Sequence, residues 1–130
     1  MANPNIVAVT SIKGESIGEA LTTTLTTDIM TVAADKLVKI NYISVTNDAA
    51  SALTVVTVAI NKAGFTSDGI GSGEDNAALI FLASTVRCPA DDVLVVIDKP
   101  VYLMEGDTLD AGASAATADI FVSYEVIDDA

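Results

Sequence analysis

Residues 36–47 read KLVKINYISVTN, and this stretch indicates the fold more clearly than any other part of the chain. Val38, Ile40 and Tyr42 alternate with other residues, which predicts a β-strand because successive side chains of a strand point to opposite faces. The apolar phase then moves to Ile43, so we expect a β-bulge near Tyr42. The stretch therefore predicts a long strand with one irregularity.

Other strand-like segments surround this one. Val, Ile and Thr make up 41 of the 130 residues, and the β-branched Val, Ile and Thr pack well on a pleated surface. The segment ALTVVTVAIN, residues 52–61, is apolar on both faces, which implies a strand covered on both sides. Five threonines among residues 22–27 disfavour a helix in that region. The remaining strands are expected at residues 5–12, 77–87, 93–98, 100–104, 108–112 and 118–127, with turns at 13–15 and a hairpin-like turn at 48–51.

The domain organisation follows from chain length and strand number. A chain of 130 residues is the size of one domain with one core. Eight or nine short strands separated by turn residues are typical of a sandwich. We therefore predict an all-β protein: a single β-sandwich of jelly-roll type that spans residues 1–130.

Composition limits the classes of partner. The formal net charge is −12, and every charged residue after Lys99 is acidic. Such a chain is repelled by phosphate backbones and anionic membranes, so we expect no nucleic acid and no membrane as partners. The acidity is interpreted as solvation of a chain that is 51% hydrophobic, with a cationic partner as the alternative. So much apolar surface favours burial against further copies, and we expect a homo-oligomer.

Residues able to perform catalysis are scarce. The sequence contains no His, which excludes Ser-His-Asp triads and most zinc sites. Cys88 stands alone, so it cannot form a disulfide within the chain, and we expect a small buried hydrophobe. The carboxylate pairs Asp91 with Asp92 and Asp107 with Asp110 are assigned to turns. We predict no enzyme activity, no catalytic residue, no cofactor and no metal site.

Two segments are candidates for contacts with a partner. Residues 62–76, KAGFTSDGIGSGEDN, form a long loop in which Phe65 and Ile70 could contact a neighbour, and an excursion without function is the alternative. The acidic residues of this loop lack the register of an EF-hand, so calcium binding is not expected. At the start of the chain, Asn3 and Pro4 lie in a short polar segment that could reach a neighbour as an arm. We expect neither an export signal nor a membrane-spanning segment, because the first residues lack a basic stretch followed by an apolar one and no apolar run reaches 18 residues.

Several stretches together resemble a known group of proteins. MANPNIVAV with SIKG, KINYISVTN, CPADDVLVVIDKPVYLMEGDTL and the ending VSYEVI are similar to small virion structural proteins of tailed marine bacteriophages, especially those that infect cyanobacteria. The resemblance covers most of the chain and is weakest in residues 62–76. It implies a protein that decorates or cements the outer capsid as a homo-oligomer such as a trimer. It also implies contact with the major capsid protein or another virion protein, and a place on the capsid surface after synthesis in the host cytoplasm.

Two alternatives remain open. A tail, neck or fibre component of the same particle would need the same kind of sandwich. A glycan-binding module would also be a His-free sandwich, and it would need exposed aromatic rings for stacking, with Tyr102 and Phe65 as candidates. Most aromatic residues alternate with Val or Ile in the expected strands, which favours core positions for them.

Overall fold

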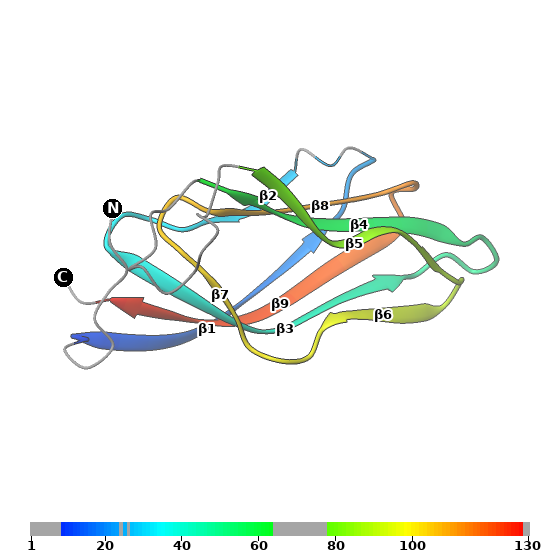
Figure 1. The fold of residues 1–130 in the computed structure, drawn as a ribbon. Helices are drawn as coiled ribbons and strands as arrows, with labels where there is room; N and C mark the ends of the chain where they lie inside the picture. The colour runs from blue at the N-terminus through cyan, green and yellow to red at the C-terminus, as the bar shows by residue number, and fades with distance from the viewer. Residues whose placement is uncertain (1–8, 24, 26, 64–77, 129–130) are drawn as a thin grey trace.

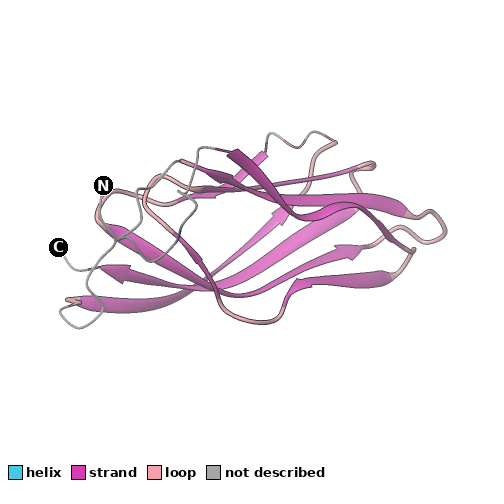
Figure 2. Ribbon diagram, viewed as in Figure 1, coloured by secondary structure: helices cyan, strands magenta, loops and turns pink. Residues whose placement is uncertain are grey.

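The computed structural model describes residues 9–23, 25, 27–63 and 78–128. Every regular element in this part of the chain is a β-strand, so the all-β prediction is confirmed (Figure 2). The strands are β1 (Ser11–Ala20), β2 (Thr27–Thr31), β3 (Lys36–Asn47), β4 (Thr54–Lys62), β5 (Ala78–Cys88), β6 (Asp92–Ile97), β7 (Val101–Leu103), β8 (Thr108–Ala113) and β9 (Ala118–Asp128).

The strands form two antiparallel sheets that pack face to face (Figure 1). Sheet A has the order β1-β9-β3-β6, and sheet B has the order β2-β8-β4-β5. The short strand β7 pairs with β3 on the same side as β6, so β6 and β7 are two halves of one edge strand. Pro100 lies between these halves, and a proline has no N–H to donate to a ladder. With β6 and β7 counted together, the eight strands have the jelly-roll arrangement predicted from the sequence.

The core between the sheets consists of small and branched side chains. Ile43 and Val122 of sheet A, and Val58 and Leu109 of sheet B, have no exposed surface. Cys88 belongs to the same cluster and is buried, which confirms its predicted role as a small hydrophobe. Because the chain contains few aromatic residues, many medium-sized side chains fill the space between the sheets.

Strand β3 contains the irregularity that its sequence predicts. The pairing of β3 with β9 shifts register between Ile40 and Tyr42, which is a β-bulge at Asn41. The bulge allows Ile40 and Ile43 both to face the core. Tyr42 was expected on the same face as Ile40, and this is wrong: because the bulge precedes it, Tyr42 pairs with Ser123 and is only partly buried.

Two local predictions are corrected by long-range pairing. Residues 13–15 are no turn, because β1 runs through them and pairs with β9 as far as Ala20. The turn at 48–51 closes no hairpin, since it connects β3 in sheet A to β4 in sheet B. In the segment 52–61, Ala59 is fully buried and Val55 is partly buried on the second face, while Leu53, which precedes β4, is exposed, so this face is covered in part. The first strand begins at Ser11, and half of its predicted range, residues 5–8, lies outside the described residues.

Asn47, at the end of β3, fixes the point where the chain leaves sheet A. Its side chain is fully buried. The Nδ2 group donates to the carbonyl oxygens of Ala52 (2.9 Å), Cys88 (3.1 Å) and Pro89 (3.2 Å). The Oδ1 atom accepts from the Thr117 hydroxyl (2.9 Å) and from the backbone amide two residues further on (3.1 Å). One amide group thus joins three connections at the same end of the sandwich.

The carboxylates assigned to turns differ in their positions. Asp91 lies in a turn with a positive φ of 53°, whereas Asp92 is the first residue of β6. Asp107 lies in the turn between β7 and β8, as predicted. Asp110 lies inside β8 and is buried, so its assignment to a turn is wrong. The strand continues through Asp110 because β8 pairs with a neighbour on each side.

Asp107 also anchors the end of β4. Its Oδ2 atom accepts from Lys62 Nζ (2.6 Å) and from the Met104 N–H (2.9 Å), and its Oδ1 atom accepts from the Ala63 N–H (3.0 Å). Asp107 is almost completely buried. A buried carboxylate is tolerated when its oxygens are paired in this way. These contacts therefore fix the end of β4 at Lys62 and Ala63.

Candidate functional site

The residues predicted to make contacts lie outside the part of the chain that the structure describes. Asn3 and Pro4 precede residue 9, and Phe65 and Ile70 fall between residues 63 and 78. Their roles stay predictions. Tyr102, the other ring considered for glycan stacking, lies on β7 and is exposed.

The described residues offer neither a metal centre nor a membrane-spanning helix. That part of the chain brings together no group of three or more Cys, Asp or Glu side chains able to hold a metal ion. It also includes no helix long and apolar enough to cross a membrane. The features that remain are surface hollows and exposed apolar side chains.

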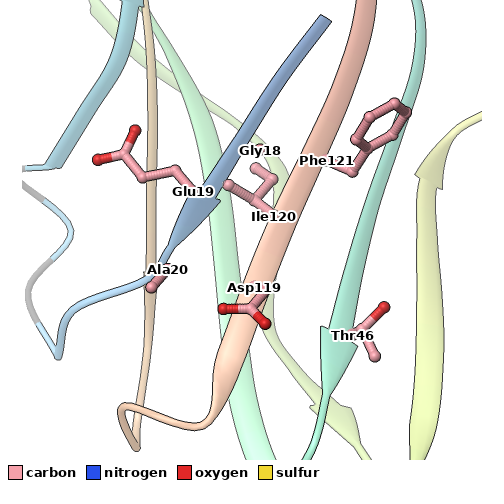
Figure 3. A pocket seen from close by; sticks show the side chains of 7 residues that line it. All are labelled: Gly18, Glu19, Ala20, Thr46, Asp119, Ile120 and Phe121. Carbon is pink, nitrogen blue, oxygen red and sulfur yellow. The ribbon is translucent and has the colours of Figure 1, made fainter.

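A hollow of about 540 Å³, here called the Phe121 hollow, lies at the end of β1 on sheet A (Figure 3). It is lined by Gly18, Glu19, Ala20, Thr46, Asp119, Ile120 and Phe121. In the sheet register, Gly18 is opposite Phe121 and Ala20 is opposite Asp119. A Cβ placed on Gly18 would meet nothing within 4 Å. The hollow therefore exists because small residues on β1 leave space beside the larger side chains of β9.

The Phe121 hollow presents a ring, a carboxylate and a hydroxyl to solvent. The Phe121 ring is 46% exposed. Phe121 and Thr46 lie on the same side of β9, Asp119 lies on β9 itself, and Glu19 points away on the far side of β1 (Figure 3). This arrangement offers one apolar surface for stacking and two polar groups for hydrogen bonds. Such a combination suits a shallow binding surface.

A second hollow of about 470 Å³ adjoins the same ring. This Tyr124 hollow is lined by Gly14, Glu15, Ser16, Asn41, Phe121, Ser123, Tyr124 and Glu125. The Tyr124 hydroxyl donates to Glu15 Oε2 at 2.9 Å. Burial raises the pKa of Tyr124 above its usual value of 10.0, and the hydrogen bond to Glu15 and the negative charge of Glu15 raise it further. Phe121 thus stands between two acidic hollows.

Nine large hydrophobic side chains are exposed among the described residues. Three of them are consecutive on β5: Leu79 is 39% exposed, and Ile80 and Phe81 are each 50% exposed. Val95 of β6 and Phe121 of β9 are also exposed. Both residues pair with Ser44 of β3, which lies between them in sheet A and is buried. The others are Ile12, Leu53, Val93 and Tyr102.

Sequence reasoning missed these surfaces. The run ALIFLASTVR was predicted as a strand, and only its lack of charged residues before Arg87 could have indicated an exposed, unprotected edge. Phe121 alternates with Ile120 and Val122, a pattern that was interpreted as core. Neither pattern says which strand lies at an edge, because that depends on the order of strands in the sheet.

Comparison with known proteins identifies no relative. No protein-family model, no curated protein and no solved structure matches this chain.

Proposed function

We propose that this chain is a non-enzymatic structural protein of a tailed-phage virion that decorates or cements the outer capsid as a homo-oligomer. The observation that carries the proposal is the run of three consecutive exposed hydrophobic side chains on β5, Leu79, Ile80 and Phe81, which are 39–50% exposed. Contiguous exposed apolar surface commonly marks sites of contact between proteins. In a chain with a net charge of −12, such surface indicates assembly.

The fold is compatible with this role. Jelly rolls occur in viral capsid proteins and in lectins, so the fold supports the proposal by analogy alone. The stretches that resemble virion proteins include β3, β6 and the turn that contains Asp107. In this proposal the partner is the major capsid protein or another virion protein. Acidic side chains on sheet A, such as Asp119 and Glu125, would meet basic residues of the shell, which steers encounter and sets orientation.

Copy number in purified particles tests the proposal. The chain would be quantified by mass spectrometry against the major capsid protein, in virus particles from the source of this sequence. Hundreds of copies per particle are expected for a shell decoration. A few tens or fewer would place it in the neck, tail or fibres instead. Complete absence from the particles would overturn the virion role.

The Phe121 hollow favours a second candidate, a glycan-binding module. An exposed ring beside a carboxylate and a hydroxyl matches the way in which proteins stack and hydrogen-bond sugars. A glycan array probed with the wild type, Phe121→Ala and Tyr102→Ala tests this role. The matched control is Phe81→Ala, which removes a ring of similar exposure from the other sheet. Loss of binding in Phe121→Ala alone would support the module, and no binding by the wild type would exclude it.

A further inference from the structure

The edges of the two sheets are protected to different degrees. Unpaired backbone groups at a sheet edge can pair with another chain, and proteins usually prevent this with charged residues, Pro or short strands. In sheet A, β1 bears Lys13, Glu15 and Glu19, and the β6–β7 edge is interrupted at Pro100. In sheet B, β2 has five residues. Three of the four edges therefore carry a recognisable protection.

Strand β5 is the exception. It has 11 residues and, among the described residues, pairs with β4 alone. Its sequence, ALIFLASTVRC, contains no Asp, Glu, Lys or Pro. Leu79, Ile80 and Phe81 are exposed along it. A long, apolar edge of this kind is expected to pair with another strand.

The register of β5 limits the part that can pair. Strand β5 contains two bulges. At the first, Thr57 of β4 lies opposite two residues, Ser84 and Thr85; at the second, Leu82 has no partner in the register between Phe81 and Ala83. These two bulges interrupt the middle of the strand. Regular pairing remains in Val86–Cys88 and in the longer segment Ala78–Phe81, and the longer one contains the three exposed hydrophobic side chains. Regular backbone and exposed apolar side chains thus coincide.

We propose that the Ala78–Phe81 edges of two copies of this chain pair antiparallel about a two-fold axis, so that sheet B continues from one molecule into the other. The inference rests on the proposed assembly into homo-oligomers and specifies its interface. Antiparallel pairing of one strand with its own copy is self-complementary, as a two-fold contact requires. The resulting unit is a dimer, and it differs from the trimer that the sequence resemblance implies.

The charge distribution favours a second copy as the occupant. Two copies with a net charge of −12 repel each other over most of their surfaces. Residues 78–86 carry no charge, and Arg87 is the one charged residue of β5. Two copies can therefore approach along β5 with little repulsion. A cationic partner would instead be attracted to the carboxylates around the Phe121 and Tyr124 hollows.

Phe81→Lys tests the interface, with Phe121→Lys as the matched control. Both changes replace a half-exposed Phe by Lys, one on β5 and the other on sheet A. Sedimentation velocity over a concentration series should show a reversible dimer for the wild type and for Phe121→Lys. Phe81→Lys should weaken association by about tenfold or more, the effect of losing an interface anchor. Circular dichroism checks that both variants are folded.

Three results would overturn the proposal: a wild type that stays monomeric, a Phe81→Lys variant that associates like the wild type, or equal weakening by both variants. Hydrogen exchange on the wild type provides a test that needs no variant. Amides within 79–81 should exchange more slowly at high protein concentration than at low concentration, and unchanged exchange would also overturn the proposal. The experiment is independent of copy number in virions, so dimer formation and the virion role can fail separately.

Discussion

Asn47 is the residue on which three connections of the sandwich depend. Replacing it with Ala leaves the carbonyls of Ala52, Cys88 and Pro89 without this donor in a buried region. Each unsatisfied buried group costs about 1–3 kcal/mol, so Asn47→Ala should lower the free energy of unfolding by about 3 kcal/mol. Urea denaturation measures the change. The control Asn61→Ala alters an exposed amide on β4 and should shift stability by less than about 0.5 kcal/mol; equal effects would contradict a special role for Asn47.

Tyr124 gives stability a dependence on alkaline pH. Its pKa is raised above 10.0, first by burial and then by Glu15, so folding disfavours the ionised ring. The contribution is therefore fully present below the pKa of the unfolded state, about 10, and is lost as the pH rises through the higher folded pKa. Tyr124→Phe should lose less stability above pH 10 than the wild type. Chemical denaturation across this pH range measures the difference.

The Glu15→Gln variant separates the causes of the Tyr124 shift. It removes the negative charge near the hydroxyl but leaves the burial of the ring unchanged. Because burial is the largest cause, the alkaline loss of stability should be reduced and not abolished. If Tyr124→Phe and Glu15→Gln both lost stability with rising pH as the wild type does, Tyr124 would not contribute to the alkaline loss of stability.

At the scale of the element, the bulge in β5 holds a strained residue. Thr85 has a φ of 50°, a left-handed conformation that β-branched residues rarely adopt. Asn tolerates this conformation better, and the backbone N–H of residue 85 would still donate to the Thr57 hydroxyl. Thr85→Asn should therefore raise the free energy of unfolding by about 1 kcal/mol. Thr46→Asn, at an exposed strand position with ordinary φ, should be neutral or slightly destabilising; a destabilised Thr85→Asn would show that the Thr hydroxyl matters more than the strain.

Some elements could be predicted from the sequence because their signals are local. The alternation in 36–47 identified β3 and its bulge, since both depend on the side-chain pattern within one strand. The segment at 13–15 was misread because Lys-Gly-Glu has the composition of a turn, whereas its pairing with β9 extends the strand through Gly14. The turn at 48–51 was found, but whether it closes a hairpin or crosses between sheets depends on where β4 pairs.

At the scale of the whole molecule, the candidate surfaces were less predictable than the fold. Composition indicated excess apolar surface but not its location. Phe121 has the same alternating neighbours as a core residue, and it is exposed because no further layer covers the outer face of sheet A among the described residues. Likewise, the apolar segment 78–81 became a candidate interface only when β5 was found at the edge of sheet B. Strand order, which no single segment encodes, decided both positions.

The balance between charge and apolar contact predicts how salt affects association. Two molecules with a net charge of −12 repel each other, and the Debye length falls from about 30 Å at 0.01 M salt to about 8 Å at 0.15 M. The β5 contact is uncharged between residues 78 and 86, so screening should weaken the repulsion while leaving the attraction intact. Added sodium chloride should therefore strengthen dimer formation, as measured by sedimentation equilibrium at constant pH. Lowering the pH toward the isoelectric point of about 4.1 should act in the same direction by protonating carboxylates. An association that salt weakens would instead indicate an interface held by ion pairs, which the composition of β5 does not offer.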